Sequence, residues 1–107
     1  MKKQTTELGK LVSETREKLG ISQRELARRS NMDCAEVSRI EAGKRLKPNI
    51  LYLKGIAETL NLSMVDLMKL AGYDDIDINW VKIYLLKDLL LIIKNKYKVM
   101  NNFTFML

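Results

Sequence analysis

The stretch SQRELARRSNMDCAEVSRIEAGK, residues 22–44, decides the fold of this chain. Ser22 and Glu25 have the Ser-x-x-Glu spacing of a capping box, which begins a helix, and this helix should end near Ser30. Asn31 follows as the turn residue, because asparagine tolerates a positive φ better than most residues. The sequence therefore predicts a short helix followed by a tight turn.

A second short helix should follow that turn. Asp33 and Glu36 repeat the capping spacing, so the helix should begin after Asp33 and run to about Ala42. Val37 and Ile40 are three residues apart and are expected on its buried face. Two short helices held at an angle by so few connecting residues are typical of a helix-turn-helix.

Three further amphipathic helices are predicted around this stretch, at about residues 5–19, 50–60 and 63–71. Gly20 should end the first of them, and Asn49 should cap the second. Ser63 and Asp66 form a capping pair for the third. The apolar residues expected in the core at this last helix are Leu62, Met64, Leu67, Met68 and Leu70.

The end of the chain should form another helix, at about residues 80–97, which is apolar around most of its circumference. Lys87 and Asp88 interrupt its apolar runs, and a membrane span needs about 20 mostly apolar residues, so no span is expected. A helix this apolar must be covered, and we expect it to join two copies of the chain. Packing on its own domain and docking of a different protein are the alternatives. The residues expected at this contact are Trp80, Ile83, Tyr84, Leu90 and Leu91.

Composition and charge support an all-α protein with two parts. Of the 107 residues 47% are apolar, only 5 are glycine and 1 is proline, and strand-like alternation is almost absent. The formal net charge is +6. Residues 1–73 hold 14 Lys and Arg against 9 Asp and Glu, whereas residues 74–107 hold 5 against 4. The positive charge therefore accompanies the helix-turn-helix domain at 1–73, and 74–107 is a separate apolar segment.

Residues that are rare or missing narrow the possible functions. The chain has one cysteine, Cys34, and no histidine, which excludes an intrachain disulfide and a Cys/His zinc site. It also lacks the commonest general base, so we expect no enzyme activity, no cofactor and no metal. The first residues, MKKQTTELGK, lack the apolar run of a secretory signal, so a cytoplasmic location is expected.

Three segments in a fixed order resemble the Xre family, the phage Cro and repressor-like regulators. They are LGISQRELA at 19–27, VSRIEAGK at 37–44 and IAETLNLS at 56–63. The resemblance covers about residues 6–71. It implies an all-α fold, a five-helix lambda-repressor-like DNA-binding domain with an additional C-terminal helix here. It also implies binding of double-stranded DNA at an operator.

The resemblance assigns roles to individual residues. Base contacts are implied for Cys34, Ala35, Ser38 and Arg39. Arg39 is the strongest candidate among them, because its fork pairs bidentately with guanine. Phosphate contacts are implied for Gln23, Lys44, Arg45 and Lys47. Arg16 and Glu41 match a structural arginine–glutamate pair of the family.

The helix from Asp33 departs from the family pattern. Members often have Ser or Thr at its start and a glutamine early in it, where this chain has Asp33, Cys34 and Ala35. Asp33 and Glu36 bring negative charge near a polyanion, which should weaken DNA binding. For Arg39, exposure to solvent and an ion pair with Glu36 are the alternatives to DNA contact.

The function that follows is a homodimeric, sequence-specific transcriptional repressor without a catalytic site. Repression fits because it needs only occupancy of an operator. The alternative is a protein-interaction module, an antitoxin or adapter, which binds a partner through the C-terminal segment.

Overall fold

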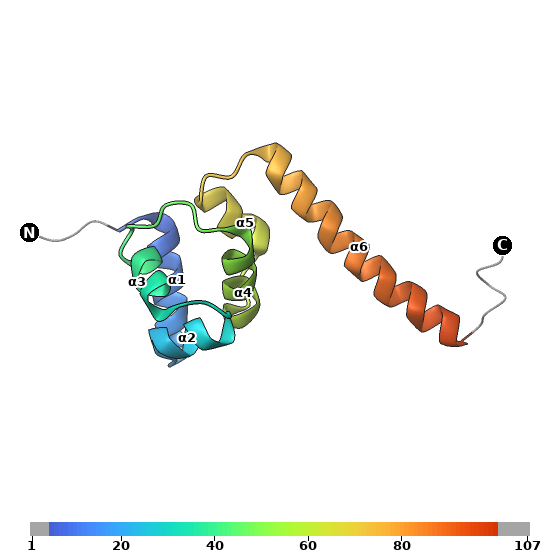
Figure 1. Cartoon of the computed structure of the whole chain (residues 1–107), viewed down its shortest axis with the longest axis horizontal. Coiled ribbons are helices and arrows are strands. Elements are labelled where there is room, and N and C mark those ends of the chain that lie inside the picture. The colour runs from blue at the N-terminus through green and yellow to red at the C-terminus, as the bar shows by residue number, and fades with distance from the viewer. Residues whose placement is uncertain (1–4, 101–107) are drawn as a thin grey trace, which may run out of the picture. The chain divides into compact units, whose positions relative to one another are not determined.

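The computed structural model describes residues 5–100, apart from the side chains of residues 92 and 96–100. This part of the chain contains six α-helices and no strand (Figure 1). The helices are α1 (Glu7–Lys18), α2 (Gln23–Arg29), α3 (Cys34–Glu41), α4 (Ile50–Leu60), α5 (Met64–Leu70) and α6 (Asp75–Met100). The chain is therefore all-α, as the sequence predicts.

Contacts divide the chain into two units, Met1–Asp74 and Asp75–Leu107. The first holds α1 to α5 around one apolar core, and the second is the single long helix α6 (Figure 1). The largest side chains of the core are Leu8, Val12, Leu26, Val37, Ile40, Leu53, Ile56, Leu67 and Met68. They come from all five helices, so the core fixes each helix of the first unit against the others.

Side-chain caps begin four of the first five helices. The Thr6 hydroxyl accepts a bond from the Gly9 amide and Ser22 from Glu25, at 2.9 and 3.0 Å. The other two capping bonds run from Tyr52 to Asn49 and from Asp66 to Ser63. These caps satisfy backbone donors that a helix start leaves without intrahelical partners.

The cap predicted for α3 is wrong. Asp33 occupies the position before the helix, but its side chain makes no capping hydrogen bond. Glu36 does not reach back to it either, because its carboxylate is engaged by two arginines. The capping pattern thus located the start of α3 correctly but misassigned what these two side chains do.

Three of the five residues expected in the core at α5 are not fully buried, since Leu62 and Met64 are half-buried and Leu70 is exposed. Leu67 and Met68 are fully buried, whereas Leu70 is 37% exposed. At about 100° per residue, Leu67, Met68 and Ala71 share one side of the helix and Leu70 points away from it. The spacing of three from Leu67 to Leu70 suggested a shared face, but the buried stripe lies on the other side of Leu67.

Two glycines inside helices allow backbones to meet, and the sequence reasoning missed both. A Cβ at Gly9 of α1 would lie 2.5 Å from the Ile40 carbonyl oxygen and 2.7 Å from that of Glu41. A Cβ at Gly55 of α4 would lie 2.7 Å from the Ser30 carbonyl oxygen. Since glycine weakens a helix by about 1 kcal/mol relative to alanine, its presence at such positions signals a packing requirement.

Candidate nucleic-acid interface

Helices α2 and α3 form the helix-turn-helix, and the core holds both firmly. Leu26 and Ala27 of α2 and Val37 and Ile40 of α3 are at most 3% exposed. Asn31 turns the chain between them with φ of 55°, as its position in the sequence predicts. Because Val37 and Ile40 anchor one side of α3, the opposite side is presented to solvent in a fixed orientation.

That opposite side carries the four residues for which the sequence implies base contacts. Cys34, Ala35, Ser38 and Arg39 are all exposed, and helical geometry places them on one face, which we call the outer face of α3. An α-helix fits the major groove of B-DNA, where base edges are distinguishable. The structure thus brings these four side chains together on one exposed helix face.

A buried ion pair ties α1 to the end of α3. The Arg16 Nε atom lies 2.6 Å from Glu41 Oε2, and its Nη2 donates to Oε1 at 3.0 Å. The two side chains are only 13% and 7% exposed, and this bond raises the pKa of Arg16 above its ordinary value although burial opposes it. Arg16 also donates to the Ile21 carbonyl at 2.9 Å, so one guanidinium links three segments of the domain.

Gln23 joins the same cluster at the first position of α2. Its Nε2 donates to Glu41 Oε1 at 3.0 Å, which fixes the direction of the side chain. An amide nitrogen carries two hydrogens, so one N–H remains for a further acceptor such as a phosphate oxygen. The backbone N–H groups at the start of a helix favour an anion at the same place.

A second buried carboxylate, Glu36, holds two of the arginines implied to contact DNA. Its side chain is 9% exposed. It accepts from Arg45 Nε at 2.8 Å, Arg45 Nη2 at 3.2 Å and Arg39 Nη1 at 3.3 Å. The Glu36 charge expected to repel DNA is therefore shielded from solvent and neutralised by its partners.

Residue spacing in the sequence predicts only one of the two ion pairs of Glu36. Glu36 and Arg39 are three residues apart on one helix, so their ion pair was foreseen as an alternative for Arg39. Arg45 reaches Glu36 from the loop after α3, and a helical period gives no information on that contact. The sequence reasoning missed it.

The remaining basic residues of the loop after α3 also lie at the surface. Lys44, Arg45 and Lys47 are exposed. The Lys47 ammonium lies 4.5 Å from the centre of the Tyr73 ring, a cation–π distance, and the Tyr73 hydroxyl donates to the Pro48 carbonyl at 2.7 Å. Tyr73 thus orders this part of the loop.

Another carboxylate with two arginines lies on α2. Glu25 accepts from Arg28 and from Arg29, with shortest distances of 2.6 Å to each. These bonds, with that from Arg28 the strongest, lower the pKa of Glu25 from 4.5 to about 2. Here the carboxylate is 29% exposed and the arginines are 70% and 49% exposed, so this cluster is more open than the one at Glu36.

Residues 5–100 contain no group of three or more Cys, Asp or Glu side chains placed to hold a metal ion. None of the helices in this range is long and apolar enough to cross a lipid bilayer.

Comparison with known proteins agrees with this geometry. A search of curated proteins finds no match for the chain. A model of the helix-turn-helix family HTH_3 matches residues 12–67, just over half of the chain, and includes α2, the turn and α3. The chain therefore belongs to the HTH_3 helix-turn-helix family, a family of DNA-binding domains to which the Xre and Cro-like regulators belong.

Proposed function

We propose that the protein is a cytoplasmic, sequence-specific transcriptional repressor that binds operator DNA as a homodimer. The observation that carries the proposal is the fixed presentation of the outer face of α3. Its far side is locked by Val37 and Ile40, and its end is tied to α1 by the Arg16–Glu41 pair. A rigid helix keeps its register in the major groove while its side chains contact base edges.

Base and phosphate contacts divide between the helix and its surroundings. On the outer face of α3, Arg39 donates to a guanine and Ser38 to a base or phosphate, while Cys34 and Ala35 offer apolar contact to a thymine methyl. Gln23, Lys44, Arg45 and Lys47 bind phosphates and set the position of the protein on the duplex. Occupation of an operator in this way is enough to repress transcription.

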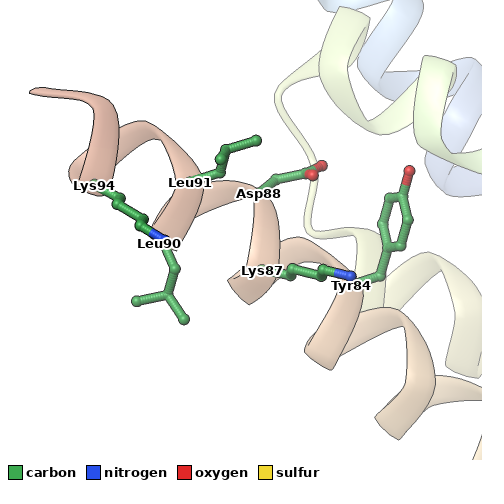
Figure 2. Close-up of a pocket in the computed structure, with 6 residues that line it drawn as sticks. All are labelled: Tyr84, Lys87, Asp88, Leu90, Leu91 and Lys94. Carbon is green, nitrogen blue, oxygen red and sulfur yellow. The ribbon is translucent and has the colours of Figure 1, made fainter. Parts of the chain in front are cut away.

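The homodimer rests on the exposed apolar side of α6. Trp80, Ile83, Tyr84, Leu90 and Leu91 are between 56% and 67% exposed. Their spacing places them on one broad side of the helix. Figure 2 shows part of this side, a hollow lined by Tyr84, Lys87, Asp88, Leu90, Leu91 and Lys94.

Large apolar side chains in this number need a protein partner, since continuous apolar surface is rarely left in water. A second copy of the chain is such a partner, and pairing serves the proposed function. Two-fold symmetry sets two copies of α3 about 34 Å apart, one turn of DNA, so that they meet successive major grooves on one face of the duplex.

Selection of bound duplexes from a random DNA pool tests the proposal. At about 150 mM salt, phosphate attraction alone no longer dominates binding. We expect recovery of an inverted repeat whose half-site centres are about 10 base pairs apart. Failure to recover any motif would overturn sequence-specific recognition.

The solution mass tests the dimer separately. A mass twice the 12.4 kDa of the chain supports pairing of two copies. The exposed side of α6 also suits a different protein, which is the antitoxin or adapter alternative. A monomer that selects no DNA motif would favour that alternative.

A further inference from the structure

We propose that Glu36 is a positioning residue for DNA recognition: its buried carboxylate orders Arg39 and Arg45 and so sets how selectively the protein reads its operator. This inference rests on the proposed function, because it concerns the same DNA-facing surface. Nothing in the family resemblance assigns this role to Glu36, which the sequence suggested as a capping residue, as an unfavourable charge near DNA and as an alternative ion-pair partner of Arg39.

The Glu36 carboxylate lies below the protein surface, and the guanidinium groups of Arg39 and Arg45 lie above it. The Glu36 side chain is 9% exposed, whereas those of Arg39 and Arg45 are 50% and 47% exposed. Each guanidinium therefore touches the carboxylate on one side and solvent on the other. The two arginines also come from different segments, α3 and the loop that follows it, so the carboxylate links these two segments.

The guanidinium N–H groups that do not bind Glu36 suit two different kinds of DNA contact. Arg39 uses Nη1 for Glu36, so its Nε and Nη2 remain as a pair of donors for a guanine edge. Arg45 donates to Glu36 through Nε and Nη2, so only its Nη1 group is left unbound. A single donor group of this kind fits a phosphate oxygen better than a base. One carboxylate thus favours base contact for Arg39 and phosphate contact for Arg45.

Ordering the side chains of Arg39 and Arg45 before DNA binding improves selectivity for the operator. A free arginine on the surface adopts many rotamers, and all of them satisfy phosphates, which line the whole duplex. An arginine that is already held loses less conformational entropy when it binds in the one geometry that a guanine requires. The carboxylate also offsets one of the two positive charges, which lowers the general attraction to DNA.

Removing the carboxylate charge should therefore separate affinity from selectivity. Glu36→Gln removes the negative charge that holds the two arginines and replaces one acceptor oxygen by an NH2 donor, so their fixed pairing is lost and one more positive charge is available to phosphates. Binding to DNA of any sequence should become tighter, while discrimination at the base pair read by Arg39 should decrease. An effect of charge alone would tighten binding without the loss of discrimination.

The chain supplies a matched control at Glu25. That carboxylate also holds two arginines, and Glu25→Gln makes the same change of charge in the same helix-turn-helix. Its partners, Arg28 and Arg29, lie on α2 and not on the outer face of α3. We expect this variant to bind DNA somewhat more tightly in general, with unchanged discrimination.

The experiment compares three duplexes for the wild type and both variants. They are the selected operator, the operator altered at the Arg39 base pair, and a scrambled duplex. A bidentate arginine contributes roughly 5- to 150-fold discrimination at one base pair. We expect Glu36→Gln to lower this discrimination by roughly tenfold, with tighter binding to the scrambled duplex. Discrimination equal to that of Glu25→Gln would overturn the proposal.

Two further measurements keep the result interpretable. In the DNA-free protein, the side-chain Nε–H signal of Arg45 should be protected from exchange, because this group donates to Glu36, and Glu36→Gln should remove this protection. If that variant does not fold, Glu36→Asp tests the same cluster with the negative charge kept. Its shorter side chain draws the carboxylate back from both guanidiniums, so discrimination at the Arg39 base pair should again decrease, and unchanged discrimination would contradict the proposal.

The failures of the two proposals are distinguishable. If the wild type selects no motif, the proposed function fails and the role of Glu36 fails with it. If the wild type selects an operator that Glu36→Gln reads equally well, only the role of Glu36 fails.

Discussion

Helix α3 carries two buried carboxylates, Glu36 and Glu41, and each forms an ion pair with arginine. The two carboxylates have different roles. Glu41 is bound by Arg16 and Gln23 and connects α3 to the rest of the domain. Glu36 is bound by Arg39 and Arg45, whose outer sides face solvent. A buried charge without a partner is strongly destabilising, so each carboxylate commits its partners to a fixed position.

The first prediction concerns the Arg16–Glu41 pair. Glu41→Ala leaves a nearly buried guanidinium without its carboxylate, and breaking such a pair costs about 3–5 kcal/mol. The free energy of unfolding, measured by urea denaturation, should decrease by an amount in this range. Glu17 provides the control, because it lies 3.8 Å from the same Arg16 but is 69% exposed. Glu17→Ala should lower stability by less than about 1 kcal/mol, and equal losses in both variants would contradict the role given to the buried pair.

A second prediction separates base contact from phosphate contact. Arg39→Ala should relax one position of the selected repeat, with a loss of about 1–3 kcal/mol on the preferred operator. Lys44→Ala should weaken binding to all duplexes alike and reduce the dependence of log K on log salt concentration by about 1. Binding curves on operator and altered duplexes at several salt concentrations measure both. A uniform loss from Arg39→Ala would place that residue among the phosphate contacts instead.

At the scale of helices, the sequence predicted what depends on neighbours along the chain. The starts of α2 and α5 followed from Ser22 and Ser63, whose hydroxyls cap the helix within three residues. The turn followed from Asn31, which has the expected positive φ. These features depend on short spacings, and short spacings can be read directly from a sequence.

What the sequence reasoning missed depends on contacts between distant segments. Arg45 meets Glu36 from a loop, and the Gly9 position meets the end of α3 across more than 30 residues. The error at Asp33 has the same origin, since Glu36 is drawn away from the helix start by arginines rather than completing a cap. Spacing alone does not reveal which partner a side chain will prefer once the helices pack.

The close approach at Gly9 gives a prediction for the contact between α1 and α3. Alanine in place of a helical glycine normally stabilises by about 1 kcal/mol, but here the added Cβ would lie 2.5 Å from a backbone oxygen of Ile40. We expect Gly9→Ala to destabilise the protein by about 1–3 kcal/mol, the usual range for overpacking. Gly20→Ala is the control: no atom lies within 4 Å of its Cβ, and only its φ of +70° is unfavourable.

Urea denaturation of both variants, with DNA affinity measured alongside, checks this prediction. Gly9→Ala should also weaken operator binding, because the displaced backbone belongs to the end of α3. Gly20→Ala should lose stability through backbone strain but keep the operator affinity of the folded protein. A Gly9→Ala protein as stable as the wild type would show that α1 and α3 adjust to the methyl group.

At the scale of the whole molecule, the two units have different surfaces and different proposed tasks. The first has an apolar core to which each of α1 to α5 contributes. The second is a single helix with exposed apolar side chains along most of its length. The core of the first unit and the exposed apolar side of α6 are the basis on which we propose DNA recognition for the first unit and pairing for the second.

This assignment predicts that pairing and half-site recognition are separable. Leu90 is 56% exposed on α6, so Leu90→Asp should leave the core of the first unit intact and place a carboxylate within the proposed contact. The solution mass should decrease to the 12.4 kDa of one chain. Binding to a single half-site should be unchanged, while affinity for the full repeat should decrease by roughly 10²- to 10⁴-fold, the usual gain from linking two binding modules. Lys82→Asp, on another side of α6, should keep both the dimer and the full-repeat affinity. A Leu90→Asp protein that remains dimeric would show that this side of α6 does not join the two copies.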